Sequence, residues 1–535
     1  MDDLKIGMAF SGGGYRAATF DLGSLSFLDY IKLDDGRSLL DCVVVLTSVS
    51  GGTITALKYM LARARGQAVG DMVKELFDFL CNEDLVKKAM QRMSDERANR
   101  EMSSIKIMAD IYDTCLFDNA VFGDLIDNFA KIPVKDYTAL ATDFNNSLVF
   151  RFRIIDVKSP EESINDKVIG NQKDKINPEV MRHITLGEAL ACSSCFPSGF
   201  EPMMFPDDFK LSQREDIVKT IKNRIALMDG GVVDNQGLDP ITKAEERLFK
   251  YRSDKSRTDK AMDFVIISDV ASSEMDAYTP SEQILPDKVG KLTIGRLRNY
   301  GLITMGVFAA LFVLALVMGS GFWTGVMSVL LAISVVGNAI GAWSKRSMYR
   351  AIGKTFVGNN ATFISHLKFA TLEAMLMNRA KSVVMMTSDV FLKHMRRQGY
   401  NKLYEDKGWK NRLISNAIHE LKPNPQRQAR IEKGTLAPYL MPSAAIHENT
   451  IKAASMGTTL WFTSAHKQAG MPQALMATGQ YTMCFNLLDY IYKIEKSPEN
   501  LNENHKLIIG CKDQLMQAWN KFQEDPHWMV KSMQK

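Results

Sequence analysis

The chain has 535 residues, with 66 Lys and Arg against 61 Asp and Glu, and 46% of its residues are hydrophobic. A net charge of +5 over this length argues against a nucleic-acid partner, and the apolar fraction is that of a folded protein with a sizeable core. No Pro/Gly/Ser-rich linker and no internal repeat divides the sequence, so we expect one large unit and not a string of modules.

The first motif lies near the N-terminus. Residues 5–10 have the pattern of a short strand, and Ser-Gly-Gly-Gly-Tyr-Arg at 11–16 leads into a helix. Three glycines before a helix let backbone N–H groups point at one spot, where the helix dipole adds positive potential. The loop lacks both the Gly-Lys-Ser/Thr ending of a nucleotide loop and the Gly-x-G-x-x-Gly spacing of a dinucleotide site. It therefore predicts an anion hole, which would suit the oxyanion of an attacked ester.

The second motif is a strand, a sharp turn and a helix around Ser50. The apolar run Val43–Leu46 precedes Ser-Val-Ser-Gly-Gly at 48–52, and a helix-forming segment follows. Such a turn lifts a serine hydroxyl out of a sheet, and it needs small residues two positions to either side. Gly52 meets this need fully and Ser48 meets it in part. Ser50 is therefore the predicted nucleophile of a small-x-Ser-x-Gly elbow.

The third motif is a strand, Ile225–Asp229, that ends in an aspartate followed by two glycines. Ligands of open α/β sheets gather at the carboxyl ends of the strands, so we expect Ser50 and Asp229 to share one crevice. In a dry pocket a carboxylate can accept the serine proton. For Asp234, the plainer prediction is that it caps the helix beginning at Leu238; the alternative is that it tunes Asp229 by like-charge repulsion.

Together these segments resemble the patatin-like phospholipases. In that family a Gly-Gly-Gly-x-Arg/Lys loop forms the oxyanion hole, a Gly-x-Ser-x-Gly elbow carries the nucleophile, and an Asp-Gly-Gly/Ala motif supplies the aspartate of a dyad without histidine. Order and spacing agree along residues 5–240. The resemblance assigns the oxyanion hole to Gly12, Gly13 and Gly14, the basic position to Arg16, the nucleophile to Ser50 and the base to Asp229.

The similarity extends further, with two departures. Ala191–Pro202 resembles the family's Ala-Ser-x-Ala-x-Pro segment, Asp234–Gly237 resembles the bacterial-type continuation, and Ala474–Ile491 resembles the closing helix of larger members. Ser48 stands where the family usually has glycine, and Ala17 where glycine often follows the basic residue. We expect the turn to survive with a slightly strained backbone.

The resemblance implies an α/β fold of the three-layer patatin-like type, a modified α/β-hydrolase with a central, mainly parallel sheet. It implies a phospholipase A type of lipid acyl hydrolase, which cleaves fatty acyl esters of phospholipids by a Ser-Asp dyad through an acyl-enzyme. Two alternatives stay open: an acyltransferase or neutral-lipid esterase with the same dyad, and a non-catalytic membrane scaffold or lipid sensor.

Other polar residues offer weaker candidates for the chemistry. Ser193 and Ser194 have the pattern of a turn before Pro197 and are not expected to be nucleophiles. An ordinary lipase triad would need a histidine after the acid, and His447 and His466 stand at acceptable positions but in no recognisable setting.

The cysteines do not predict a metal or redox site. Seven are scattered along the chain, and only Cys192 and Cys195 form a Cys-x-x-Cys pair, without the second pair of a zinc site. We expect reduced thiols in the cytosol, and neither a metal nor a cofactor.

An uncharged stretch separates Arg298 from Lys345. It holds two strongly apolar runs around Gly-Ser-Gly at 319–321, each long enough to cross a hydrocarbon core as a helix. The alternative, a buried hairpin of a soluble core, would show shorter segments and some polar face. The sequence therefore favours a transmembrane hairpin with helices at about 301–319 and 322–343.

The flanks of this hairpin are basic, with Lys288, Lys291, Arg296 and Arg298 before it and Lys345, Arg346, Arg350 and Lys354 after it. Such residues stay on the cytoplasmic side, and the glycine loop begins too near Met1 to leave room for a leader. We therefore expect a two-helix membrane protein whose catalytic part is cytoplasmic. Its partners would be the phospholipid bilayer and a lipid substrate. Gly337 and Gly341 form a Gly-x-x-x-Gly motif, which leaves a homo-oligomer through the hairpin as an option.

The predicted organisation is a catalytic core at 1–290, the hairpin at 291–350 and a helical part at 351–535 that completes or caps the core. Phe264–Val270 is predicted as a late strand of the sheet, so the hairpin is inserted within the core and not appended to it. The helices predicted after the hairpin are Phe363–Met377, Ser382–Arg397, Trp409–Leu421, Met471–Ile494 and His505–Phe522.

Overall fold

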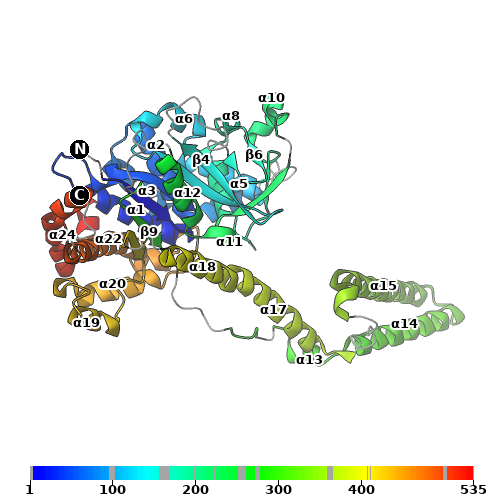
Figure 1. Ribbon diagram of the computed structural model, residues 1–535. Helices are drawn as coiled ribbons and strands as arrows, with labels where there is room; N and C mark the ends of the chain where they lie inside the picture. Colours follow the sequence, from blue (N-terminus) through cyan, green and yellow to red (C-terminus); the bar gives the residue numbers. More distant parts are fainter. Residues whose placement is uncertain are drawn as a thin grey trace. The chain divides into compact units, whose positions relative to one another are not determined.

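The computed structural model describes residues 4–94, 103–155, 169–197, 199–221, 223–250, 261–271, 278–282, 284–357, 366–406, 408–409, 411–497 and 503–533. The chain forms two compact units (Figure 1). The sheet unit comprises residues 1–275 and 387–535, and the hairpin unit comprises residues 276–386.

The strands all belong to the sheet unit. They are β1 Ile6–Phe10, β2 Val43–Val49, β3 Asp136–Asp143, β4 Leu148–Ile155, β5 Ile169–Gly170, β6 Lys175–Ile176, β7 Met203–Phe205, β8 Ile225–Asp229, β9 Phe264–Asp269 and β10 Leu413–Ala417. Their order is β10-β9-β1-β2-β3-β4-β5-β6, with β8 paired to β3 and β7 paired to β8. The strands from β10 to β3 are parallel, and the remaining pairs are antiparallel. The predicted α/β fold with a mainly parallel central sheet is confirmed.

Helices surround this sheet. Those before β9 are α1 Gly14–Tyr30, α2 Gly51–Arg65, α3 Val69–Asn82, α4 Leu85–Ser94, α5 Ser104–Leu116, α6 Phe122–Asp127, α8 Pro178–Met181, α9 Leu186–Ser194, α10 Glu215–Val218, α11 Gly231–Asp234 and α12 Leu238–Lys250. Those near the C-terminus are α18 Leu392–Glu405, α19 Pro425–Glu432, α20 Ala444–Ala454, α21 Ser464–Gln468, α22 Met471–Lys496, α23 Glu503–Gly510, α24 Lys512–Glu524 and α25 Trp528–Met533.

The central strands are largely apolar and buried, as expected where both faces of a sheet are covered. Every residue of β1 is buried. On one face, α1 packs closely on α22, because a Cβ at Gly23 would lie 2.2 Å from the carbonyl oxygen of Met476, and one at Gly479 would lie 2.1 Å from that of Phe20. On the other face, α12 joins a core cluster with β1, β2 and β9. The C-terminal helix α22 is therefore part of the sheet unit's core.

The chain after the hairpin completes the sheet, and here one predicted helix is wrong. Trp409–Leu421 holds the strand β10, which extends the sheet beyond β9. The open edge of β9 offers a ladder of backbone partners, and the buried Asn416 turns inward to donate to the hydroxyl of Ser24 at 2.9 Å. Tertiary pairing thus outweighs the local preference of this segment.

The remaining elements predicted after residue 260 are confirmed in some cases and differ in their bounds in others. Met471–Ile494 is confirmed as α22, and Phe264–Val270 as β9, which lies inside the sheet between β10 and β1. His505–Phe522 is helical but is divided at Cys511 into α23 and α24. Ser382–Arg397 spans the end of one helix, a π-helical turn at 386–391 and the start of α18. The first residues of the helix predicted at 363–377 lie outside the described residues, and the described helix begins at Phe369.

The hairpin unit holds α13 Asp287–Gly290, α14 Ile294–Val317, α15 Gly321–Val357 and α17 Phe369–Met385. By length and composition, Gly295–Val317 and Gly321–Ile340 could each cross a membrane, and almost none of their residues are buried. Asn338 joins the two helices by donating to the carbonyl oxygen of Gly301 at 3.0 Å. A Cβ at Gly337 would meet no atom within 4 Å, and the side chains at 344–357, including the basic flank that follows the hairpin, are not described.

Candidate active site

The register of β3 explains why Ser50 and Asp229 meet. One edge of β3 pairs with β4 over its whole length, and the other edge pairs first with β2 and then with β8. Along that second edge Val49 is opposite Leu140, and Asp229 is opposite the next residue, Ala141. Beyond Ser50, where β2 ends, the antiparallel β8 therefore pairs with the same edge of β3. The rule about carboxyl ends of parallel strands does not account for this meeting, because β8 runs in the opposite direction.

Ser50 sits on a strained turn between β2 and α2. Its backbone has φ 49° and ψ −121°, a conformation that costs a non-glycine residue about 1–3 kcal/mol. The two following residues must be small, because a Cβ at Gly51 would lie 2.1 Å from the carbonyl oxygen of Gly14, and one at Gly52 would lie 2.7 Å from the Cβ of Phe10. The backbone here has the form of a nucleophile elbow.

Asp229 is buried beside this elbow. Its carboxylate accepts hydrogen bonds from the side chain of Ser50 and, at 2.7 Å, from the N–H of Gly231. Burial raises the pKa of Asp229 to about 6, although both hydrogen bonds act to lower it. Its backbone is fixed by the hydroxyl of Thr142, which donates to its carbonyl oxygen at 2.8 Å. A carboxylate of raised basicity thus contacts the serine hydroxyl.

One of the three amides of the glycine loop is already hydrogen-bonded within the protein. The N–H of Gly12 donates to the carbonyl oxygen of Asn235 at 3.0 Å and is therefore engaged. Within the part of the chain that the structure describes, the N–H groups of Gly13 and Gly14 donate no hydrogen bond. Gly12 serves close packing, since a Cβ there would lie 3.1 Å from the Cβ of Ser50. The N-terminus of α1 adds its positive potential at Gly14.

Arg16 binds a distant segment of the chain. Its guanidinium donates to the carbonyl oxygen of Met456 at 2.5 Å and to the hydroxyl of Thr458 at 3.4 Å. It is 9% exposed, and burial lowers its pKa to about 10. The next residues of that segment reach the glycine loop, because Tyr15 donates its N–H to the carbonyl oxygen of Thr459 at 2.7 Å. These contacts match a role for Arg16 in orienting the glycine loop.

Ser48 has contacts that glycine could not make. Its hydroxyl pairs with the hydroxyl of Tyr137 at 3.1 Å and accepts from that of Thr53 at 3.1 Å, and all three residues are fully buried. Thr53 pairs in turn with the hydroxyl of Ser193 at 3.0 Å. The serine at 48 is therefore part of a polar network beneath the elbow, which explains the departure from the family's glycine.

Ser193 and Ser194 are in α9, so the predicted turn at these residues is wrong. The hydroxyl of Ser193 accepts from the N–H of Ser50 at 2.9 Å, and the backbone of the same segment accepts from the N–H groups of Asp229 and Gly230. The end of α9 thus connects Ser50 to Asp229. In the sequence, only the resemblance of Ala191–Pro202 to a segment of the family pointed to this region. The residue types alone did not reveal that the segment contacts Ser50 and Asp229.

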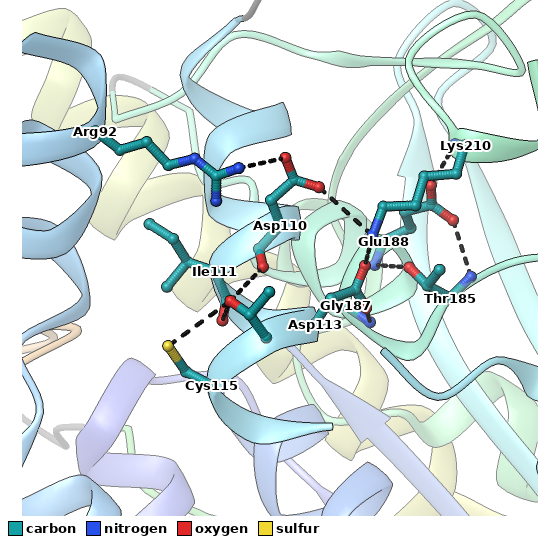
Figure 2. Close-up of polar contacts among 10 residues, drawn as sticks. Arg92, Asp110, Ile111, Asp113, Cys115, Thr185, Gly187, Glu188 and Lys210 are labelled. Carbon is teal, nitrogen blue, oxygen red and sulfur yellow. Dashed lines mark hydrogen bonds and ion pairs between the residues drawn. The ribbon is translucent and has the colours of Figure 1, made fainter. Parts of the chain in front are cut away.

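The start of α9 is fixed by a buried polar cluster (Figure 2). Thr185 and Glu188 form a capping box there. Asp113 of α5 accepts from the N–H of Gly187 at 2.8 Å, and the ammonium group of Lys210 donates to Asp113 at 2.7 Å. Burial raises the pKa of Glu188 to about 7. Because α9 is held at both ends, Ser193 has little freedom to move away from the elbow.

The remaining predicted residues have contacts away from the dyad. Asp234 accepts from the N–H of Asp239, in the first turn of α12, at 2.9 Å, as a cap would. His447 pairs with the carbonyl oxygen of Leu421, and His466 lies in the first turn of α21. Among the described residues, no group of three or more His, Cys, Asp or Glu is arranged to hold a metal ion.

The sequence reasoning missed Asn235. A Cβ at Gly12 would lie 2.4 Å from its side-chain oxygen, and a Cβ at Gly231 would lie 2.5 Å from the same atom. Its carbonyl oxygen also accepts from Gly12. Asn235 therefore lies between the glycine loop and the segment after Asp229, and only the fold reveals this.

Residues 8–242 match the model of the patatin-like phospholipase family. A search of curated proteins found no match. Among solved structures, human GIVD cytosolic phospholipase A2 is similar with a TM-score of 0.32 and 13% identity, over 50% of this chain and 43% of that one. The same enzyme in complex with methyl gamma-linolenyl fluorophosphonate gives a TM-score of 0.27 and 17% identity, over 36% of this chain and 29% of that one. The chain thus spans less than half of that enzyme's length.

Proposed function

Because residues 8–242 form a patatin-like phospholipase domain, we propose that this chain is a membrane-anchored lipid acyl hydrolase that cleaves phospholipids with a Ser50–Asp229 dyad. The observation that carries this proposal is the register of β3, which sets Val49 and Asp229 opposite consecutive residues. A strained serine and a buried carboxylate of raised pKa are thereby brought side by side.

The reaction begins with acylation of the serine. Asp229 accepts the proton of the Ser50 hydroxyl as its oxygen attacks the carbonyl carbon of a fatty acyl ester. The oxyanion that forms accepts hydrogen bonds from the N–H groups of Gly13 and Gly14, beside the N-terminus of α1. The ester bond then breaks, and the alcohol leaves as lysophospholipid with the proton that Asp229 held.

Deacylation reverses the roles of the same groups. Asp229 takes a proton from water, whose oxygen attacks the acyl-enzyme carbonyl. The bond to Ser50 breaks, the proton returns to the serine oxygen, and the fatty acid leaves. An acceptor alcohol in place of water would give acyl transfer, which is the competing activity of the same dyad.

Anchoring through α14 and α15 would supply the substrate. A catalytic unit held at the bilayer meets phospholipid at a high effective concentration. The basic residues before α14 would lie on the cytoplasmic side and would attract anionic lipid by about 1 kcal/mol each. A soluble polar ester would gain nothing from this anchoring.

The test is hydrolysis of defined phospholipids by the purified full chain in detergent, with products identified by mass spectrometry. Ser50→Ala and Asp229→Asn should each lower fatty-acid release by about a thousand-fold or more, since the two groups act as one unit. Asp234→Asn is the matched control, because an asparagine can still accept the N–H of Asp239.

The products decide between the alternatives. Free fatty acid and lysophospholipid support a hydrolase, whereas acyl groups recovered on an added alcohol acceptor support a transferase. Activity retained in either dyad variant would contradict the dyad, and no turnover of any ester would favour the scaffold or lipid sensor.

A further inference from the structure

Helix α17 of the hairpin unit has one side covered and the other bare. The connector at 278–285 lies along its polar side, where Asn378 accepts from the N–H of Ser281 at 2.7 Å and Lys381 donates to the carbonyl oxygen of Thr279 at 2.6 Å. Glu373, at the border of this side, accepts from the N–H of Leu285 at 3.1 Å. No described side chain of α17 is buried.

The opposite side of α17 is apolar. At 100° per residue, Leu376 and Val383 project from one stripe, on the far side from Asn378 and Lys381. Leu376 is 49% exposed and Val383 is 62% exposed. Of the other exposed apolar residues of α17, Met375 and Val384 lie to either side of this stripe, and Met377 lies between Val384 and Lys381. An exposed apolar stripe on a helix is typical of a surface that contacts something else.

The start of α17 is fixed beside the start of the first apolar helix. The N–H of Phe369 donates to the carbonyl oxygen of Leu292 at 2.9 Å, and Thr293 and Lys368 form a β-bridge. The helix α14 begins at the next residue, Ile294, and its uncharged apolar part begins after Arg298. If α14 crosses a bilayer, the first turn of α17 therefore lies at the boundary between water and lipid.

Charge around this boundary is positive. Lys288, Lys291, Arg296 and Arg298 precede the apolar part of α14. Lys368 and Arg379 lie along one border of the apolar stripe of α17, where long basic side chains can place their charge among headgroups while their stems cover apolar surface. This pattern of an apolar face with basic borders is that of a helix lying in the membrane interface.

We propose that α17 lies in the plane of the cytoplasmic membrane surface, with Leu376 and Val383 in the lipid and anionic headgroups at its basic border. The inference rests on the proposed insertion of the hairpin and extends it, because it gives the enzyme a third contact with the bilayer. Three observations agree on which face of α17 would contact lipid. They are the apolar stripe, the connector hydrogen-bonded to the opposite side and the first turn held beside the start of α14.

The test uses the full chain carrying Ser50→Ala, so that the vesicle lipids stay intact, reconstituted in phosphatidylcholine vesicles that contain phosphatidylglycerol. Four variants introduce one cysteine each: Leu376→Cys and Val383→Cys on the stripe, and Ala374→Cys and Ser382→Cys outside it. Labelling by a charged, membrane-impermeant maleimide is measured on the relevant peptide by mass spectrometry, which separates it from native cysteines. Burial in lipid should slow labelling of the stripe pair about ten-fold or more relative to the other pair.

Each outcome has a distinct meaning. Equal labelling of all four cysteines in protein that resists alkaline extraction overturns the interfacial helix but leaves the hairpin proposal intact. Protein that alkaline extraction removes overturns the hairpin proposal itself. Protection of the stripe pair that disappears when the protein is diluted with excess lipid would overturn the lipid as occupant, in favour of a second copy of the chain.

Discussion

At the scale of single residues, the site depends on a few groups held in costly states. Ser50 has a positive φ, and Asp229 is a carboxylate at 7% exposure whose hydrogen bonds offset only part of the cost of burial. Both states persist because neighbouring backbone and hydroxyl groups fix them. Strain and desolvation of this kind are typical of a catalytic centre.

The pKa of Asp229 predicts the acid limb of the pH profile. Burial raises this pKa to about 6, and only the ionised carboxylate can accept the serine proton. The kcat/KM for a soluble ester should therefore fall about ten-fold per pH unit below about pH 6 and level off above it. The limb should be unchanged in Asp234→Asn, and a profile flat through this range would show that Asp229 is not the base.

Ser193 should matter more than its neighbour. Ser193→Ala removes the acceptor of the Ser50 N–H and leaves that amide without its partner, a loss of about 1–3 kcal/mol. We expect kcat to fall with little change in KM, measured on a soluble ester. Ser194→Ala is the control, because Ser194 contacts Tyr112 and not the elbow; equal losses in both variants would mean that α9 acts only through stability.

Replacing Ser48 by glycine, the usual residue of the family at this position, should lower the stability of this protein. Ser48→Gly leaves the buried hydroxyl of Tyr137 without its partner and should lower the free energy of unfolding by about 1–3 kcal/mol, as measured by urea denaturation. Adding Tyr137→Phe should recover part of that loss, because both polar partners are then gone. A Ser48→Gly variant as stable as the native chain would contradict the proposed role of the network.

At the scale of elements, two connections between distant segments support the site. The end of α9 links Ser50 to Asp229, and its start is held by the cluster around Asp113 and Glu188. The segment between α20 and α21 reaches the glycine loop through Arg16 and Tyr15. The glycine loop is thus supported by residues more than 400 positions away in the sequence.

The contacts of Arg16 predict a loss that does not depend on the substrate. Arg16→Ala removes the bonds to Met456 and Thr458 and should lower kcat similarly for phospholipid and for a neutral ester, because the glycine loop is loosened in both cases. Rates on the two substrates, measured in the same detergent, check this. A loss confined to phospholipid would instead indicate that Arg16 binds the lipid phosphate.

At the scale of the whole molecule, the hairpin unit is inserted between two neighbouring strands. The chain leaves the sheet after β9, forms residues 276–386 and returns to build β10 beside β9. Parallel neighbours always need a crossover connection, so a large insertion at this point leaves the ladder unbroken. The sheet unit keeps its own core, and α22 closes it.

Membrane insertion through α14 is tested by one buried charge. Val307 is exposed near the middle of the apolar helix, and Val307→Arg should disfavour insertion by about 2.5–3.5 kcal/mol. The fraction of protein that resists alkaline extraction from membranes should fall, while Val307→Leu should behave as the native chain. An unchanged fraction in the arginine variant would argue that α14 does not cross the bilayer.

The sequence by itself determined the glycine loop, the elbow at Ser50, the aspartate at Asp229 and the uncharged hairpin, because each is written in a local pattern of residue types. Only the tertiary structure decided that Gly12 is engaged with Asn235, that Ser193 supports the elbow and that residues 413–417 form a strand. Those outcomes depend on which segments become neighbours. A backbone amide or an open strand edge takes whichever partner the fold brings to it, and the residues near it in sequence do not reveal that partner.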